Sequence, residues 1–205
     1  MKSRPAVVVL AAGTGSRFSA SRHKLTQRLG ASSILGSTLR HAIASHLPVV
    51  VVTTHALADA ARRHVASRDV VVVPAVGTPG PEPLGMGYSI AIGVAARPQA
   101  SGWLVLPGDM PMVQTSTLLE VARALDHHPV AYAQHKGLRG HPVGFAAELY
   151  SELVTLSGDE GAKRLVARYP AQGVEVDDPG VLIDVDTEAD LEQLRQAASA
   201  ASAPR

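Results

Sequence analysis

The chain has 205 residues, of which 46% are hydrophobic and 18% are charged, and it contains no cysteine. This length and composition suit one globular α/β domain with a sizeable core, and the lack of cysteine excludes disulfides, thiolate zinc sites and cysteine nucleophiles. The formal net charge of +1 gives no general attraction to nucleic acid or membranes, and no apolar run approaches the roughly 18 residues of a membrane span. The first apolar run ends in glycine and basic residues follow it, so we expect no signal peptide and a cytoplasmic protein.

The charges are distributed unevenly along the chain. All charged residues before Asp59 are basic, whereas eight of the ten charged residues in 171–205 are acidic. A basic first part and an acidic last part would suit a nucleotide–metal complex bound between them.

The first element is an apolar run from Ala6 to Ala11, which predicts a strand buried on both faces of a parallel sheet. It opens into residues 13–16, Gly-Thr-Gly-Ser, where two glycines allow backbone N–H groups to approach a ligand closely. Arg17 and Lys24 follow, and cations behind a glycine loop favour polyphosphate binding. A glycine-rich connection with solvated cations is the alternative interpretation.

Two better-known glycine loops do not fit this stretch. A dinucleotide fingerprint would need glycine at Phe18 and an acidic residue about 20 positions further on, but no acid occurs before Asp59. A P-loop would need a glycine before Lys24 and a hydroxyl residue after it.

Helices and strands then alternate. Helices are predicted over Ile34–His46 and Ala56–Val65, the second with Asp59 able to pair with Arg63. Strands are predicted at Val49–Val52 and Val70–Val73. This alternation indicates a parallel, doubly wound sheet, in which ligands bind at the carboxyl ends of the strands.

A long loop over residues 75–87 comes before a predicted helix from Tyr88 to Ala96, with Ser89 near its start. Loops of this length are uncommon in compact domains and tend to be functional or disordered. The loop and the helix start could read the edge of a nucleotide base, or the loop could be a mobile surface segment.

A buried strand over Trp103–Leu106 leads to Asp109, a carboxylate at the end of a central strand. Mg²⁺ takes one or two carboxylates together with substrate phosphates, so Asp109 is a candidate ligand. The alternative is a helix cap, but Thr115 and Ser116 are better placed to cap the next helix.

The chain continues with a predicted strand over Pro129–Ala133, a turn-rich basic segment over Lys136–Val143, and two short helices over Ala147–Leu156 and Gly161–Arg168. His141 in the basic segment either contacts a ligand or is hydrogen-bonded in the core.

Carboxylates gather near the C-terminal end. A predicted last strand, Val181–Ile183, would place the following Asp184 and Asp186 on one side, where they either complete a metal site or are surface acids. Thr187 and Asp190 fit the cap of a final helix.

The Ala/Ser-rich residues 197–205 are expected to fray. We therefore expect one domain over residues 1–196 and a flexible tail after it.

Taken together, five segments resemble the nucleotidyltransferase (MobA-like) family of molybdenum cofactor biosynthesis, and most closely its cytidylyltransferase branch. They occur in the family's order and cover most of residues 5–195: LAAGTGSRF with Lys24 after it, GMGYSIAIG, LPGDMPMV, GLRGHPVGF with GDEGAKRL behind it, and DVDTEADL. The resemblance implies a single-domain, three-layer α/β/α fold, Rossmann-like of the glycosyltransferase-A type, with a mostly parallel sheet. It also implies Mg²⁺-dependent transfer of CMP from CTP to the terminal phosphate of molybdopterin, with release of pyrophosphate.

The resemblance also implies roles for individual residues. Ala12 resembles the cytidylyl branch, because the guanylyl branch carries a glycine there, and this favours CTP. Phe18 and Ser19 depart from the family, in which Met and Gly are usual. The implied catalytic residues are Arg17, Lys24 and Asp109; the implied nucleotide-binding residues are Leu10, Ala11, Ala12, Gly13, Thr14, Gly15, Arg17, Lys24, Gly85, Met86, Ser89, Pro107 and Gly108; the implied acceptor-binding residues are Arg139, Gly140, His141 and Pro142; and the implied metal ligands are Asp109 and Asp186, with Asp184 as a further candidate.

Two other functions stay open at this point. The same fold could use GTP, or another phosphorylated acceptor such as a phosphosugar or phospholactate, because function depends on the site and not on the fold. A different class would be a non-catalytic nucleotide-binding accessory protein, for example a molybdoenzyme chaperone. Expected partners are CTP or GTP, a molybdopterin-type acceptor, and a target molybdoenzyme or its chaperone, with no nucleic acid and no membrane.

Overall fold

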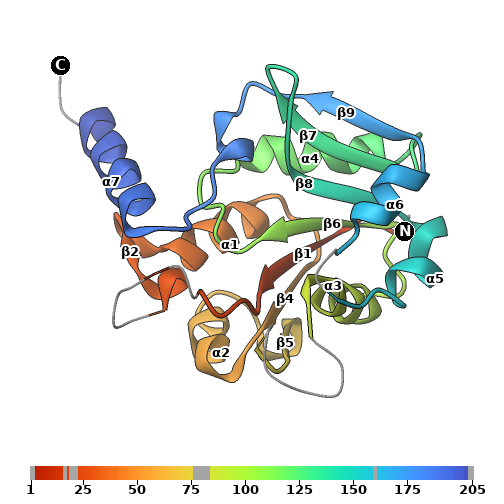
Figure 1. Ribbon diagram of the computed structural model, residues 1–205, viewed down its shortest axis with the longest axis horizontal. Coiled ribbons are helices and arrows are strands. Elements are labelled where there is room, and N and C mark those ends of the chain that lie inside the picture. The colour runs from red at the N-terminus through yellow and green to blue at the C-terminus, as the bar shows by residue number, and fades with distance from the viewer. Residues whose placement is uncertain (1–2, 16–17, 19–22, 76–83, 159–160, 203–205) are drawn as a thin grey trace.

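The computed structural model describes residues 3–15, 18, 23–75, 84–158 and 161–202. Within these ranges one seven-stranded sheet forms the centre of the molecule, with helices on both faces (Figure 1). The predicted three-layer α/β/α fold with a mostly parallel sheet is confirmed. In spatial order the strands are β5 (Val70–Val72), β4 (Val49–Thr53), β1 (Ala6–Ala11), β6 (Gly102–Pro107), β8 (Leu138–Ala146), β7 (Val130–His135) and β9 (Ala171–Glu175).

β1 lies inside the sheet, as the third of the seven strands, because its side chains are apolar on both faces. It pairs in parallel with β4 on one side and with β6 on the other. Val7 and Val9 are buried against one helical layer, and Ala6 and Val8 against the other. In this sheet, only β8 runs against its neighbours, β6 and β7.

The helices divide into two layers. Helices α1 (Ile34–Ala44), α2 (His55–Arg62) and α4 (Thr115–Ala124) bury their apolar side chains on the face of Val7, and helices α3 (Met86–Ala95), α5 (Tyr150–Leu153) and α6 (Lys163–Arg168) on the face of Val8. Helix α7 (Glu188–Ser202) packs Leu191 against the first layer. Shorter elements complete the fold: η1 (Lys24–Thr26), β2 (Arg28–Leu29), β3 (Ser32–Ser33), η2 (Ser67–Asp69), η3 (Ala147–Leu149) and η4 (Pro179–Leu182).

The predicted strand at Val181–Ile183 is wrong. The chain forms the 3-10 turn η4 there, because the Asp178 side chain accepts a hydrogen bond from the Gly180 amide (2.9 Å) and Pro179 occupies the first position of the turn. The apolar character of Val181 is explained by full burial under β8. Asp184 and Asp186 therefore follow a turn, and strand alternation does not determine their directions.

Strand β9 was not predicted. It is an edge strand that pairs in parallel with β7, and its side chains are half-buried or exposed. Its sequence, AQGVE, lacks the apolar alternation by which a half-buried strand is recognised. The two-residue strands β2 and β3 were too short to give any such pattern.

Local details also differ from expectation. Asp59 pairs with Arg62 (3.1 Å), not with Arg63. Neither Thr115 nor Ser116 caps α4; the cap position is Gln114, whose amide donates to Asp178 (2.8 Å) from a distant segment.

The basic segment Lys136–Val143 contains a turn only at residues 136–137, where both residues have positive φ, and continues as strand β8. Helix α3 begins at Met86, two residues before its predicted start. The predicted loop over 75–87 falls largely on residues 76–83, which lie outside the described residues.

The predicted cap of α7 is confirmed. The Asp190 carboxylate accepts from the Thr187 amide (2.7 Å), and the Asp190 amide donates to the Thr187 hydroxyl (3.2 Å). The helix continues to Ser202 and so includes residues 197–202 of the segment predicted as a tail. No helix in the described ranges is both long and apolar enough to cross a membrane.

Asp178 joins three segments of the fold. It is 2% exposed and accepts hydrogen bonds from the Gln114 amide, the Thr117 hydroxyl (2.6 Å) and the Gly180 amide. We predict that Asp178→Ala lowers the free energy of unfolding by about 3 kcal/mol, because it leaves buried donors without an acceptor. Urea unfolding followed by circular dichroism measures this change.

Asp59→Ala is the matched control, because the Asp59 side chain is 88% exposed and its ion pair with Arg62 lies on the surface. We expect it to change the free energy of unfolding by less than about 0.5 kcal/mol. Equal stability of the two variants would show that Asp178 does not hold the fold as described.

Candidate active site

A pocket of about 550 Å³ lies at the edge of the sheet where β1 and β6 end. Because these strands are parallel, their carboxyl ends meet there, and β8 brings its first residues to the same edge. The lining residues are Leu10, Ala11, Ala12, Gly13, Thr14, Gly15, His23, Lys24, Leu25, Met86, Ser89, Pro107, Asp109, Met110, Arg139, Gly140, His141, Val181, Leu182, Asp184 and Asp186.

The glycine loop forms one wall of the pocket and is fastened by His23. The His23 Nδ1 atom accepts a hydrogen bond from the Leu25 amide (3.2 Å). The proton therefore sits on Nε2, which lies 3.0 Å from the Gly13 carbonyl oxygen and donates to it. This contact ties the loop to the segment that carries Lys24.

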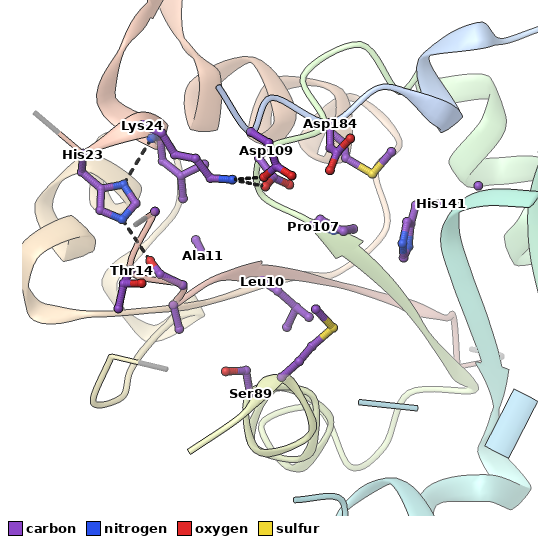
Figure 2. A pocket seen from close by; sticks show the side chains of 18 of the residues that line it. Leu10, Ala11, Thr14, His23, Lys24, Ser89, Pro107, Asp109, His141 and Asp184 are labelled. Atoms are coloured by element: carbon purple, nitrogen blue, oxygen red, sulfur yellow. Dashed lines mark hydrogen bonds and ion pairs between the residues drawn. The ribbon is translucent and has the colours of Figure 1, made fainter. Parts of the chain in front are cut away.

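Lys24 joins the loop to the carboxylates. Its Nζ atom lies 2.6 Å from an Asp109 oxygen and 2.9 Å from an Asp186 oxygen. The three side chains are only 12%, 18% and 21% exposed, respectively. Figure 2 shows the Lys24 side chain extended across the pocket toward Asp109, with Asp184 nearby.

Backbone contacts place the two carboxylates side by side. The Gly108 amide donates to the Leu10 carbonyl (2.8 Å), which fixes the residue before Asp109 against the end of β1. A Cβ atom at Gly108 would lie 2.9 Å from that carbonyl oxygen, so glycine is required for this approach. The Val185 amide donates to the Asp109 carbonyl (2.9 Å) and thereby brings Asp186 to the same place.

The charges in this cluster influence one another. Burial alone would lower the pKa of Lys24, but the charges of Asp109 and Asp186 and the hydrogen bonds to them outweigh it, so this pKa is raised. Burial and the charge of Asp186 raise the pKa of Asp184 above its ordinary value. Lys24 is therefore a stable cation at neutral pH.

Ser89 lies on the opposite side of the pocket, in the first turn of α3 (Figure 2). It is 2% exposed, and its hydroxyl has no hydrogen-bond partner among the described residues. A buried hydroxyl without a partner is costly unless a ligand or water satisfies it. Ser89 is thus available to hydrogen-bond a ligand in the pocket.

The start of β8 forms the third side of the pocket. The Arg139 guanidinium lies 4.5 Å from the centre of the Tyr132 ring. At Gly140 a Cβ atom would lie 2.1 Å from the Val181 carbonyl oxygen, so β8 can approach η4 only with glycine there. His141 has a buried Nδ1 without a partner among the described residues, and burial lowers its pKa, so it is neutral at pH 7.

Most of the residues proposed from the sequence meet in this pocket. Gly85 and Gly108 each directly precede lining residues, and Pro142 is buried behind His141, to which a cis peptide joins it. Arg17 lies outside the described residues. The proposed residues that line the pocket are Leu10, Ala11, Ala12, Gly13, Thr14, Gly15, Lys24, Met86, Ser89, Pro107, Asp109, Arg139, Gly140, His141, Asp184 and Asp186.

Sequence reasoning missed five lining residues: His23, Leu25, Met110, Val181 and Leu182. His23 and Leu25 flank Lys24, and Met110 follows Asp109, so proximity to a proposed residue was the available signal. Val181 and Leu182 were assigned to a strand that does not form, and no local pattern placed them at the pocket.

The oxygen donors at the carboxylate pair suit a divalent cation. Among the described residues, no three acidic or histidine side chains come together as a metal site by themselves. Mg²⁺ bound with a nucleotide needs only one or two carboxylates, since phosphates and water supply the other ligands. The Lys24 ammonium already lies between Asp109 and Asp186 as a positive charge, so the pair is arranged to hold a cation.

Curated relatives match part of the chain. The bifunctional protein GlmU of Polaromonas naphthalenivorans is 33% identical over 130 residues, covering 61% of this chain and 27% of that protein. The purine catabolism protein PucB of Bacillus subtilis is 32% identical over 120 residues, covering 56% of this chain and 58% of PucB. The chain thus spans about a quarter of the GlmU protein and somewhat more than half of PucB.

Solved structures match nearly the whole chain. Rv0371c from Mycobacterium tuberculosis superposes with a TM-score of 0.81 at 28% identity, covering 96% of this chain and 99% of that one. A manganese complex of the same protein has a TM-score of 0.76 at 28% identity, covering 95% and 99%. Molybdopterin-guanine dinucleotide biosynthesis protein A from Archaeoglobus fulgidus shares the fold, with a TM-score of 0.63 at 17% identity over 95% and 99% of the two chains.

The family comparison agrees with this geometry. The MobA-like NTP transferase domain matches residues 7–174, which include the glycine loop, Lys24, Asp109 and the start of β8. The chain therefore belongs to the MobA-like NTP transferase domain family.

Proposed function

We propose that the protein is a nucleotidyltransferase that moves CMP from CTP to the terminal phosphate of molybdopterin and releases pyrophosphate. The observation that carries the reaction class is the meeting of the glycine loop, Lys24 and the Asp109–Asp186 pair in one pocket. A backbone cradle, a cationic side chain and a carboxylate pair are what a triphosphate with a divalent ion requires. Membership of the NTP transferase family supports the same class.

The proposed reaction needs little covalent help from the protein. An oxygen of the acceptor phosphate forms a bond to the α-phosphorus of CTP, and the bond from that phosphorus to the α–β bridging oxygen breaks. Pyrophosphate leaves with the bonding electrons. An acceptor phosphate is already anionic near pH 7, so alignment and charge neutralisation are the main requirements.

Each side of the pocket then has a role. The loop at residues 13–15 would hold the phosphates through its amides, and Lys24 would neutralise charge that develops on pyrophosphate. Asp109 and Asp186, with Asp184 as a further candidate, would hold Mg²⁺, which when bound neutralises the phosphates and orients them. Arg139 and His141 would contact the acceptor.

The charges of the pocket support a divalent cation. The carboxylates of Asp109, Asp184 and Asp186 would repel a triphosphate, and the ammonium of Lys24 is occupied by two of them. A divalent ion bound by the carboxylates would reverse the sign of this region. The structure of Rv0371c in complex with manganese shows that a chain similar to this one is found with a divalent ion, which agrees with the proposed need for such an ion.

The assignment of CTP and of molybdopterin as substrates rests on individual pocket residues and on the motif resemblance. Ala12 is 2% exposed and lines the pocket, so the atoms added or removed at this position change the space next to a bound nucleotide. Ser89 offers a hydroxyl that has no partner in the described part of the chain, on the side of the pocket where a base would lie under this proposal. Molybdopterin as the acceptor rests on the motif resemblance, and the fold shared with the Archaeoglobus fulgidus protein is compatible with it.

Measuring melting temperature and pyrophosphate release with CTP, GTP, ATP and UTP, each with Mg²⁺, tests the reaction class and the preferred nucleotide base together. We predict the largest rise in melting temperature with CTP, because a ligand stabilises in proportion to RT ln(1 + [L]/Kd). With the acceptor present, pyrophosphate should be released only when Mg²⁺ is present. A larger rise in melting temperature with GTP would show that the assignment of CTP is wrong. A rise in melting temperature without pyrophosphate release would indicate an accessory nucleotide-binding protein.

In the same assay, Asp109→Ala should lower pyrophosphate release at least about 100-fold, the loss typical of a preorganised charged group. Asp126→Ala is the control, since Asp126 is an exposed acid after α4 and is not among the pocket residues. Equal activity of both variants would remove Asp109 from the reaction.

Lys24→Ala should lower kcat by about 100-fold while the protein still folds cooperatively. Lys163→Ala removes the same charge from an exposed position on α6 and should leave kcat unchanged. Thermal unfolding measured beside the kinetics separates the two effects. A parallel loss of folding and turnover in Lys24→Ala would argue against a role at the phosphates.

Ala12→Gly should reduce the preference for CTP over GTP, measured as the ratio of kcat/KM values. The added space next to the base is the physical reason. If the ratio stays the same in this variant, the assignment of CTP from this position is wrong.

A further inference from the structure

The Lys24 ammonium occupies the position that a divalent cation would need. Both carboxylate contacts are short, 2.6 Å to Asp109 and 2.9 Å to Asp186. A Mg²⁺ ion lies about 2.1 Å from its oxygen ligands. An ion bound to the same two oxygens would therefore be at most about 5 Å from Nζ. Two positive charges at that distance in a largely buried site repel each other strongly.

Lys24 also has a second place to go. Its stem runs beside the glycine loop: a Cβ atom at Gly15 would lie 3.4 Å from the Lys24 Cγ atom. The four-carbon stem is flexible and its ammonium is a compact charge. Figure 2 shows the side chain leading from next to His23 to Asp109. The ammonium can therefore turn from the carboxylates to phosphates on the loop while the backbone stays in place.

Hydrogen bonds hold the backbone next to Lys24 in place while its side chain rotates. His23, the preceding residue, bonds to the Gly13 carbonyl and to the Leu25 amide. The Thr26 hydroxyl donates to the His23 carbonyl (2.7 Å) and holds the short helix η1. The backbone on both sides of Lys24 is thus tied down, and its side chain is the part that can move.

We propose that Lys24 blocks the Asp109–Asp186 pair to divalent cations until a nucleoside triphosphate draws its ammonium to the glycine loop. This inference rests on the proposed function, because it assigns the carboxylates to the metal of that reaction. Its consequence is that cation and nucleotide bind as a pair. By linkage, each strengthens the binding of the other by the same factor.

The proposal separates Lys24 from an ordinary phosphate-binding lysine. If Lys24 only contacted phosphates, its removal would weaken nucleotide binding and leave the affinity for a free cation unchanged. If it blocks the carboxylates, its removal takes away the positive charge between Asp109 and Asp186 and strengthens cation binding. The two roles therefore predict different results in the absence of nucleotide.

The test is a titration of the full chain with Mn²⁺ alone, in which free Mn²⁺ is followed by electron paramagnetic resonance. Lys24→Met, which keeps the length of the side chain and removes its charge, should bind Mn²⁺ at least tenfold more tightly than the wild type. Lys24→Arg keeps a cation between the carboxylates and should stay within about threefold of the wild type. The double variant Lys24→Met, Asp109→Asn should lose the gain.

Equal Mn²⁺ affinity in the wild type and Lys24→Met would overturn the proposal. A crystal structure of the wild type with Mn²⁺ alone covers the case in which Lys24→Met does not fold. The expected result is no anomalous peak between Asp109 and Asp186, with Lys24 in place. A peak there, with Lys24 still contacting both carboxylates, would contradict the blocking role.

These outcomes are independent of those that test the proposed function. Failure of the blocking role is seen without nucleotide, in the Mn²⁺ titration. Failure of nucleotidyl transfer is seen if none of the four nucleotides gives pyrophosphate release.

Discussion

The contact of one ammonium with two carboxylates unites the parts of the chain on which the site depends. Lys24 lies 85 residues from Asp109 and 162 residues from Asp186 in sequence, yet all three side chains meet at the end of β1. Backbone contacts between distant segments, and not local structure, place Asp109 and Asp186 beside Lys24. Each is placed by a backbone hydrogen bond of the preceding residue: Gly108 to the end of β1, and Val185 to the Asp109 carbonyl. The sheet thereby converts distant sequence positions into one cluster of charge.

Under the proposed function, the same cluster gives the pocket a use for both a cation and an anion. Because the Lys24 ammonium is ion-paired with two carboxylates, it is not available to phosphates, and the carboxylates are not available to a metal. A triphosphate bound with a divalent ion would satisfy both at once, because its phosphates would pair with the lysine and its ion with the acids. The glycine loop on one side and Ser89 on the other leave room for the remainder of such a ligand. The geometry and the family therefore point to the same class of substrate.

Local sequence was enough to predict the elements whose burial is uniform. The valine runs that became β1, β4 and β5, the glycine loop after β1 and the carboxylate after β6 all carry their own pattern. Features made by tertiary contacts carried no such pattern: Asp178 caps α4 from 64 residues away, and η4 forms where an apolar run resembled a strand. Strand β9 is held by pairing with β7 and not by apolar alternation. The role of His23 in fastening the loop depends on a contact with Gly13 that spacing alone did not indicate.

The most direct measurement of the central claim is a crystal structure of the chain with Mn²⁺ and a non-hydrolysable CTP analogue. The account predicts an anomalous peak between Asp109 and Asp186, with the triphosphate on residues 13–15 and the Lys24 ammonium on its phosphates. A nucleotide bound elsewhere, with Asp109 directed away from any cation, would contradict it.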